Sequence, residues 1–384
     1  MTFEFNHSTR IVFGRGRAAG LPDEVKALGG SRVLLVSDPG VVAAGLAEPL
    51  LRALADGGIA ATLFSDLSPN PRDGECRAAA DAALAAAADV VVGLGGGSAM
   101  DVAKSAAALV TNGGTVRDWE DPRRLERPPL PSVCLPTTAG TGSEVTFVAV
   151  ITDERRHYKM TLLDRRLAPD VAIVDPVLTR TLPPALTAAT GVDALTHAIE
   201  AYTCRAATPV TDVFALRAVE LVSGALERAV ADGDDMEARE QVLLGSTLAG
   251  IAFGNSDVGA VHCLGESVGG LYDTPHGVAN AAFLAEVMAF NVPADPARHA
   301  TLARALGVDT AGMDDEAAGH AAAERVRELR RRLGLPRLRD LPGVDPADFP
   351  RLAEMAAAHV CSPDNAREIS AGDYLALLRE AWEA

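Results

Sequence analysis

Four side chains near the middle of the chain have the types and spacing of ligands for a divalent metal ion. Asp193 and His197 are four residues apart in a segment with helical apolar spacing, which puts both on one helix face about one turn apart. His262 and His276 follow further along the chain. One carboxylate and three imidazoles suit Fe²⁺ or Zn²⁺ better than Mg²⁺ or Ca²⁺, which prefer oxygen. Each histidine alone fits a structural role better, so the metal prediction depends on the four together.

A glycine-rich segment, Gly93-Leu-Gly-Gly-Gly-Ser98, joins a predicted strand to a predicted helix. Glycines let a phosphate approach the backbone closely, and the free N–H groups at the start of the helix can then bind it. The segment is not the usual dinucleotide fingerprint, because Ser98 stands where its last glycine would be, and it is not a P-loop. It therefore predicts a phosphate-binding turn, with a tight turn that binds nothing as the alternative.

Two further segments could contact a nucleotide. Asp38 follows a predicted strand that ends at Ser37, where a carboxylate can accept hydrogen bonds from a ribose diol and repel a 2′-phosphate. This position favours NAD over NADP, although a capping role in Asp-Pro-Gly explains it equally well. The run from Pro136 to Glu144 supplies hydroxyl groups and flexible backbone after another strand, as a second wall for a cofactor would.

The first half of the chain alternates short β-branched runs with alanine-rich helical stretches, which predicts a parallel sheet covered by helices. The predicted strands are 31–37, 60–64, 89–94, 132–135, 148–152 and 171–174, and the predicted helices are 41–56, 74–88 and 100–110. After Pro183-Pro184 the apolar spacing is helical with little strand signal. We therefore predict a dinucleotide-binding α/β domain at 1–183 and an all-helical, metal-binding domain at 184–384.

Composition narrows the class of partner and the cellular compartment. The formal net charge of −17 argues against nucleic acid and against an anionic membrane, both of which attract Lys and Arg. Five single cysteines without a C-x-x-C motif argue against a disulfide framework. The N-terminus lacks the pattern of a signal peptide, and no apolar stretch has the length of a membrane span. These features predict a cytoplasmic protein, without identifying its substrate.

The motifs together resemble those of the iron-containing (group III) alcohol dehydrogenase family. The resemblance covers nearly the whole chain, and its specific parts are Gly95–Ser98 with Asp101 and Lys104, Pro136–Thr138 with Gly142–Glu144, Asp193-x-x-x-His197, and Thr274–Asn280. It implies a Rossmann-like α/β N-terminal domain followed by an all-α C-terminal domain, the architecture of dehydroquinate synthase and iron-dependent alcohol dehydrogenases.

The resemblance also implies roles for individual residues. The metal ligands would be Asp193, His197, His262 and His276. The cofactor contacts would be Asp38, Asn70, Gly95, Gly96, Gly97, Ser98, Asp101, Thr137, Thr138, Ser143 and Lys159. The substrate pocket would be lined by Phe147, Val148, Phe253 and Cys361.

One position departs from the family pattern. The family commonly carries a second histidine four residues after the third ligand, and here that position is Glu266. A carboxylate can also relay a proton or bind a polar substrate, so we assign Glu266 a catalytic role in proton transfer. The alternative is that Glu266 forms a salt bridge or points to solvent.

The activity implied by the resemblance is that of a metal-dependent, NAD(H)-linked alcohol dehydrogenase or aldehyde reductase. The metal would stabilise the alkoxide of a small alcohol while hydride passes to the nicotinamide. Two other activities fit the same architecture: a hydroxyacid-oxoacid transhydrogenase and a dehydroquinate synthase-like, NAD-dependent lyase. The resemblance also suggests a homodimer or a larger homo-oligomer.

Overall fold

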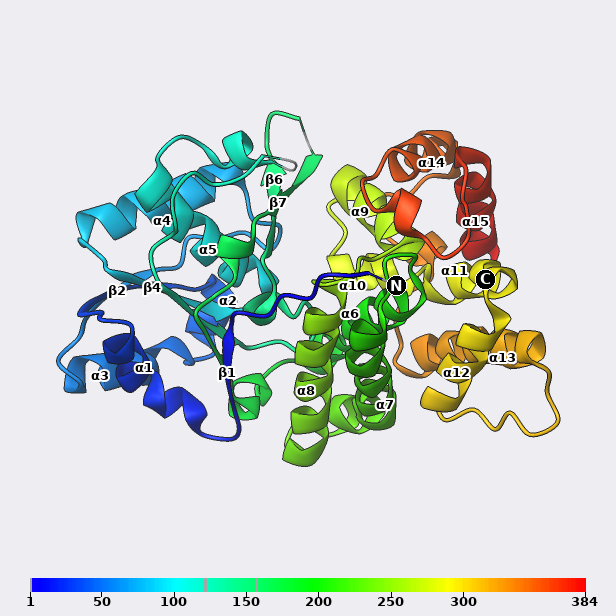
Figure 1. Cartoon of the computed structure of the whole chain (residues 1–384), viewed down its shortest axis with the longest axis horizontal. Coiled ribbons are helices and arrows are strands. Elements are labelled where there is room, and N and C mark those ends of the chain that lie inside the picture. The colour runs from blue at the N-terminus through cyan, green and yellow to red at the C-terminus, as the bar shows by residue number, and fades with distance from the viewer. Residues whose placement is uncertain (1, 121–122, 157) are drawn as a thin grey trace. The chain divides into compact units, whose positions relative to one another are not determined.

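The computed structural model describes residues 2–120, 123–156 and 158–384 of the 384-residue chain, which divides into two compact units (Figure 1). The unit His7–Leu182 contains all the strands, and we call it the α/β unit. The other comprises Pro183–Ala384 with Met1–Asn6, and we call it the helical unit. A parallel sheet with helices, followed by helices alone, is the fold class predicted from the sequence.

Six parallel strands form the main sheet of the α/β unit, in the order β1-β8-β5-β4-β2-β3. Their bounds are Arg10–Phe13 (β1), Arg32–Val36 (β2), Ala60–Phe64 (β3), Val90–Gly95 (β4), Ser132–Pro136 (β5) and Val171–Val174 (β8). On β2, Leu34 and Val36 join the hydrophobic core on one face, while Val33 and Leu35 join the core on the other. Burial on both faces explains why these strands are short apolar runs instead of alternating patterns.

Helices cover both faces of this sheet. The core that contains Leu34 is completed by α4 (Asp73–Ala85) and α5 (Gly97–Asn112), and the opposite core by α1 (Leu21–Ala27) and α3 (Ala47–Asp56). Buried alanines dominate α4 and α5, which lets both helices lie close to the strands.

The single helix predicted over 41–56 is wrong, because the structure has two helices there, α2 (Pro39–Ala43) and α3. Gly45 lies between them with a φ of 77°. This left-handed conformation interrupts the repeating backbone angles of an α-helix, and glycine adopts it without a steric penalty.

A separate two-stranded sheet pairs β6 (Val148–Asp153) with β7 (Tyr158–Leu163). The sequence predicts β6 but expects it among the strands of the parallel sheet, whereas the structure shows an antiparallel pair. Two contacts anchor β6 to α5: Lys104 Nζ donates to the carbonyl of Val148, and the N–H of Val150 donates to Asp101 Oδ2. The hairpin therefore packs on the helix that follows the glycine-rich turn.

The described residues of the helical unit form ten α-helices. They are α6 (Pro184–Thr203), α7 (Pro209–Ala231), α8 (Met236–Phe253), α9 (Ala260–Tyr272), α10 (His276–Ala281), α11 (Leu284–Asn291), α12 (Pro296–Ala305), α13 (Asp315–Arg332), α14 (Phe349–Ala357) and α15 (Ala371–Glu383). Helix α6 is buried on every side along most of its length and packs against α7, α8 and α10 (Figure 1). Within the described part of the chain, no helix combines the length and hydropathy needed to cross a membrane.

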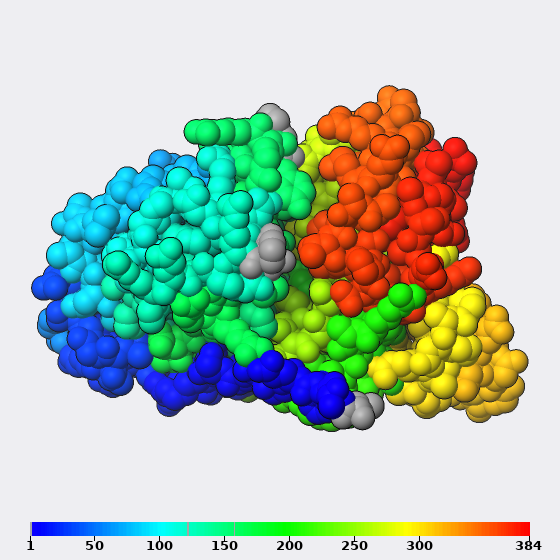
Figure 2. All heavy atoms as spheres, turned by 45° about the horizontal axis from the view of Figure 1, so that its top comes forward, coloured from blue at the N-terminus to red at the C-terminus, as the bar shows by residue number. Residues whose placement is uncertain are grey.

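The first residues of the chain pack with the helical unit, although the sequence analysis groups them with the α/β domain. Phe5 stacks on Phe214 of α7 at a centroid distance of 5.8 Å, and the N–H of Asn6 donates to Asn255 Oδ1. Figure 2 shows this segment in dark blue on the surface of the molecule.

Candidate metal centre

Three helices of the helical unit supply the four predicted metal ligands. Asp193 and His197 lie on α6, His262 lies on α9, and His276 is the first residue of α10. One ligand atom of each residue lies within 4.8 Å of those of the other three. Helix periodicity accounts for the first pair, and packing of α9 and α10 on α6 supplies the other two. We call Asp193, His197, His262 and His276 the metal set.

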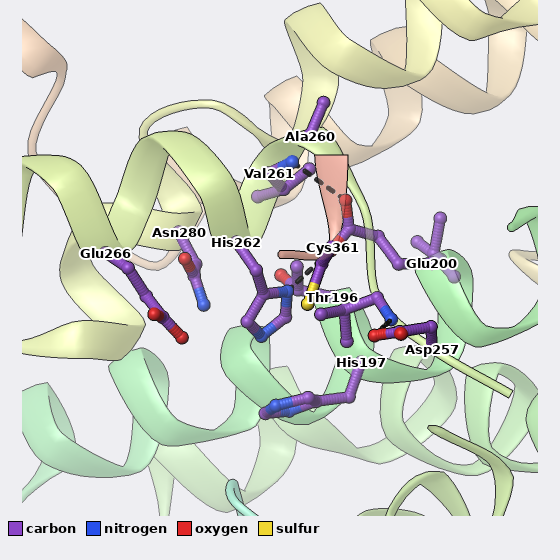
Figure 3. Close-up of polar contacts among 12 residues, drawn as sticks. Thr196, His197, Glu200, Asp257, Ala260, Val261, His262, Glu266, Asn280 and Cys361 are labelled. Atoms are coloured by element: carbon purple, nitrogen blue, oxygen red, sulfur yellow. Dashed lines mark hydrogen bonds and ion pairs between the residues drawn. The ribbon is translucent and has the colours of Figure 1, made fainter. Parts of the chain in front are cut away.

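The three imidazoles of the metal set lie close together, and Figure 3 shows two of them, His197 and His262. Ring centroids are 4.5 Å apart for His197 and His262, 5.2 Å for His262 and His276, and 6.3 Å for His197 and His276. His197 Nδ1 and His262 Nε2 are buried without a hydrogen-bond partner among the described residues. Leaving such an atom unpaired costs about 1–3 kcal/mol. A cation with a preference for nitrogen and oxygen ligands, such as Fe²⁺ or Zn²⁺, would satisfy both nitrogens, so the residues fit this group.

Burial and mutual proximity set the protonation of the metal set. Burial lowers the pKa of His197 to about 3, which leaves a neutral imidazole with a lone pair at pH 7. Burial alone would raise the pKa of Asp193, but the neighbouring imidazoles and the Asn280 amide lower it by more. Burial lowers the pKa of His262, yet Glu200 raises it by more, so the net shift is upward. Because imidazole and carboxylate ligands bind a cation in their deprotonated forms, a cation would bind more tightly as pH rises.

Glu200 contacts the metal set from α6, one turn beyond His197. Its Oε1 accepts a hydrogen bond from the Val261 N–H at 2.8 Å, and its Oε2 lies 2.5 Å from His262 Nδ1 (Figure 3). The sequence analysis does not assign Glu200 a role, because its partners are 61 and 62 residues away along the chain. The only hint in the local sequence is that Glu200 follows His197 by about one turn, on the same face of α6.

Asn280 contacts the metal set from α10. Its Nδ2 donates to Asp193 Oδ1 at 2.9 Å and lies 3.1 Å from His276 Nε2. A Cβ atom at Gly265 would lie only 2.0 Å from Asn280 Oδ1. Only glycine at position 265 of α9 therefore leaves room for Asn280 of α10. The sequence motif around Asn280 does not reveal this dependence.

Three other predicted site residues also belong to the helical unit. Phe253 stacks on His197 with a centroid distance of 4.4 Å and an interplanar angle of 21°. Glu266 lies one turn beyond His262, and its Oε2 is 2.8 Å from His359 Nε2. The backbone nitrogen of Cys361 lies 3.3 Å from His359 Nδ1. Burial would lower the pKa of His359, but the Glu266 carboxylate raises it well above its ordinary value, so Glu266 forms the salt bridge that the sequence left open as the alternative to a catalytic role.

In the α/β unit, the glycine-rich turn connects β4 to α5. Gly95 has a φ of 156°, and a Cβ atom there would lie 2.7 Å from Ala99 Cβ and 3.1 Å from Asp38 Oδ2. A Cβ atom at Gly97 would lie 2.8 Å from Thr141 Cγ2. Side chains at these positions would clash, so glycine lets the backbone pass at the first turn of a 16-residue helix. The start of such a helix is suited to binding a phosphate.

Asp38 and Ser98 border this turn. Asp38 Oδ1 caps α2 by accepting from the Val41 N–H at 3.0 Å, while Oδ2 faces Gly95. Asp38 can therefore cap a helix with one oxygen and contact a ribose with the other. Ser98 Oγ donates to the carbonyl of Pro69 at 2.5 Å, which ties the segment next to Asn70 to the turn.

The two threonines after β5 lie against the same turn. The N–H of Thr137 donates to the carbonyl of Gly95 at 2.9 Å. A Cβ atom at Gly96 would lie 3.4 Å from the side chain of Thr138. The structure therefore brings the predicted cofactor residues of β2, β4 and β5 to one end of the sheet.

A buried polar network holds the loop after Thr138. Ser143 Oγ donates to Asp101 Oδ1 at 2.6 Å, and Lys104 Nζ lies 2.7 Å from the same hydroxyl and 3.3 Å from Thr146 Oγ1. Asp101 Oδ2 accepts the N–H of Val150. Both carboxylate oxygens of Asp101 are thus bonded within the protein, which makes Asp101 a support for the Ser143 loop.

The remaining predicted residues lie at the hairpin. Phe147 and Val148 are half-buried at the start of β6. Lys159 lies on β7 and pairs with Thr152 across the hairpin. These three residues therefore come from a different part of the α/β unit than the glycine-rich turn.

Comparisons with known proteins agree over nearly the whole chain. Residues 8–176 match the model described as iron-containing alcohol dehydrogenase, and residues 187–382 match the model described as the C-terminal part of the Fe-containing alcohol dehydrogenase family. The NAD-dependent methanol dehydrogenase of Bacillus methanolicus is 38% identical over 370 residues, 96% of this chain and 97% of the relative. The lactaldehyde reductase of Escherichia coli strain K12 is 39% identical over 373 residues, covering 96% and 97% of the two chains. A crystal structure of 1,3-propanediol oxidoreductase superposes with a TM-score of 0.96 at 37% identity, covering 99% of this chain and 100% of that one.

Proposed function

The chain belongs to the iron-containing alcohol dehydrogenase family, and we propose on this premise that it interconverts a small alcohol and its aldehyde with NAD(H), at a metal ion bound by the metal set. The observation that carries the proposal is the convergence of one carboxylate and three imidazoles within 4.8 Å, with two buried nitrogens left unpaired. Without a bound cation, both nitrogens would stay unsatisfied at an energetic cost.

A bound Fe²⁺ or Zn²⁺ would supply Lewis-acid polarisation of the substrate oxygen. The protein's own residues prepare the centre for that role. Asp193 provides a negative charge, and the ring of Phe253 against His197 limits the access of water to one side of the centre. Iron and zinc both accept this ligand set.

For the cofactor, we assign the pyrophosphate to the turn Gly95–Ser98 and the adenosine ribose to Asp38. Two observations support this assignment. Any side chain at Gly95 or Gly97 would clash with its neighbours, so only glycine fits there, and one oxygen of Asp38 faces Gly95. A carboxylate at that point would repel a 2′-phosphate, which favours NAD over NADP. We infer that Asp101 acts on the cofactor only through Ser143, because its own oxygens are already bonded.

The other cofactor and substrate assignments follow the family pattern. Asn70, Thr137, Thr138 and Ser143 would line the cofactor, and Lys159 would reach its nicotinamide ribose. Phe147, Val148, Phe253 and Cys361 would line a pocket for a small, largely apolar chain. We keep Glu266 as the proton relay, supported by its position one turn from His262.

The decisive experiment replaces His276 with alanine. We expect His276→Ala to lose its metal, by elemental analysis, and its NADH formation from alcohols together, since four-ligand binding depends on each ligand. Replacement of His320, an exposed histidine on α13, is the matched control and should change neither. Full turnover by a metal-free His276→Ala protein would overturn the proposal.

Wild-type protein that forms no net NADH with any alcohol would favour the lyase, and activity without added nucleotide would favour the transhydrogenase.

We also infer a cytoplasmic homo-oligomer, with a homodimer as the simplest form. All five cysteines are free, which fits a reducing compartment. Strand β1 is an edge of the parallel sheet, and edge strands present backbone groups that a second chain can cover. Light scattering with size-exclusion chromatography measures the oligomeric state directly.

A further inference from the structure

We propose that Glu200 is a positioning residue that holds the Nδ1–H tautomer of His262 and so presents Nε2 to the metal ion. The inference rests on the proposed function, because it assigns the ion to the metal set. Glu200 is not itself a candidate ligand, since its two oxygens are directed to the backbone and to the far side of the His262 ring.

The place of Glu200 in the fold restricts its freedom. It lies on α6 beyond Asp193 and His197, so one helix carries two members of the metal set and the support for a third. Its side chain is only 4% exposed. In Figure 3, Glu200 lies above the His262 ring, while His197 lies below it.

The backbone assigns the donors and acceptors. The Val261 N–H can only donate, so Glu200 Oε1, at 2.8 Å, must accept. A carboxylate accepts at its other oxygen too, so His262 Nδ1, 2.5 Å from Oε2, must carry the hydrogen. The lone pair of the neutral ring is then on Nε2, the buried atom that has no partner in the described structure. The tautomer that Glu200 selects is the one that leaves the inward nitrogen free to bind a metal.

Two acceptors contact the backbone at the start of α9. A Cβ atom at Gly259 would lie 3.1 Å from Glu200 Oε1 and 2.9 Å from Asn365 Oδ1, so both acceptors press against the backbone there. Asn365 Oδ1 accepts the N–H of Ala260 at 3.2 Å, and Glu200 takes the next N–H, that of Val261. Glu200 therefore anchors the first turn of the helix that carries His262 and also orients its ring.

Replacement by glutamine tests this directly, because glutamine has the same shape but only one acceptor oxygen. If that oxygen stays on the Val261 N–H, the amide NH₂ faces His262 Nδ1 and donates to it. The ring must then carry its hydrogen on Nε2, which removes the lone pair that faces the metal set. The near-isosteric change should thus reverse the tautomer without opening a cavity.

We expect Glu200→Gln to bind Zn²⁺ about 10- to 100-fold more weakly than the wild type in competition with a chelator dye, the usual effect of losing such a partner. Glu286→Gln is the matched control: Glu286 is also fully buried, on α11, and pairs with Arg327 away from the metal set. It should retain wild-type Zn²⁺ affinity. In ¹⁵N NMR of the metal-free proteins at pH 9, His262 should carry its hydrogen on Nδ1 in the wild type and on Nε2 in Glu200→Gln.

The outcomes separate this inference from the proposed function. Wild-type protein that fails to bind Zn²⁺ contradicts the proposed function, whereas equal binding by wild type and Glu200→Gln contradicts only the role of Glu200. An Nε2–H tautomer in the metal-free wild type also overturns the role of Glu200, even if the variant does not fold.

Discussion

At the level of single residues, the centre depends on which atom of each side chain faces inward. His262 shows this most clearly, because one of its nitrogens is bonded to Glu200 and the other is buried and unpaired. Glu266, one turn further along α9, has a different kind of partner, since His359 binds its carboxylate at 2.8 Å. The same helix therefore carries one side chain prepared for a metal and one side chain already in a charged contact.

The contact with His359 makes the role of Glu266 testable. We expect Glu266→Gln to lower kcat on the order of 100-fold with unchanged metal content, because loss of a general acid–base group typically costs that much. His359→Gln should have a smaller effect, since it removes the partner but keeps the carboxylate. Steady-state kinetics with elemental analysis provides both readouts, and Glu354→Gln, at an exposed position on α14, controls for loss of one negative charge. Wild-type kcat in Glu266→Gln would reduce Glu266 to a salt-bridge partner of His359.

At this scale the sequence predicts ligands better than their supports. Asp193 and His197 share a helix, so their spacing alone places them together. Glu200, Asn280 and His359 meet the site across 62, 87 and 93 residues of chain, and no local pattern links them to their partners. Their roles follow only from the packing of α6, α9 and α10.

At the level of elements, the helical periodicity of the centre and the apolar runs of six of the eight described strands were predictable, whereas β1 and β7 were not predicted. The errors came from tertiary context. Gly45 adopts a left-handed conformation that breaks the helix expected over 41–56. Strand β6 has the composition of a sheet strand, but its partner β7 follows it directly in the chain, so it forms an antiparallel hairpin.

Asp153, the last residue of β6, holds this hairpin to the rest of the α/β unit. Its carboxylate accepts from Arg117 Nε at 2.9 Å and from Arg156 Nε at 2.6 Å, and it also accepts the N–H of Arg155. The Asp153 residue is only 1% exposed. The hydrogen bond from Arg117 is the largest cause of a pKa well below the ordinary value of this carboxyl, even though burial opposes it.

Because the folded-state pKa of Asp153 is lowered, its stabilising effect is fully present above the unfolded-state pKa and is lost as pH falls through the folded-state value. We expect Asp153→Asn to lower the free energy of unfolding by roughly 1.5–3 kcal/mol at pH 7, the usual worth of hydrogen bonds to a charged group. The difference from wild type should shrink below about pH 4, near the ordinary pKa of aspartate. Urea unfolding at a series of pH values from 7 to 3 measures this difference in the free energy of unfolding. Asp81→Asn, at an exposed position on α4, should show no such trend, and a difference that grows with acidity would contradict the assignment.

At the level of the whole molecule, the residues predicted to bind the metal and the glycine-rich turn predicted to bind the cofactor lie in different units. All four members of the metal set lie in the helical unit, and the glycine-rich turn lies in the α/β unit. Each unit has its own hydrophobic core, which is the basis for independent stability. The composition could not reveal that residues 2–6 pack with the helical unit, because that contact joins the start of the chain to α7.

The two tryptophans can report on the two units separately, because Trp119 lies in the α/β unit and Trp382 in the helical unit, edge-on to Phe349 at 5.6 Å. We prepare Trp382→Phe and Trp119→Phe, each with one tryptophan left, and follow urea unfolding by fluorescence. Zn²⁺ at 100 times its Kd should raise the free energy of unfolding seen by Trp382 by about 2.7 kcal/mol, since it binds only the folded helical unit. The transition seen by Trp119 should stay unchanged with Zn²⁺ and respond to NAD instead. Both a chelator and the substitution His276→Ala should abolish the Zn²⁺-induced shift seen by Trp382. Equal shifts of both probes with Zn²⁺ would mean that the units unfold as one cooperative body, and a Zn²⁺ shift confined to Trp119 would remove the metal ion from the helical unit.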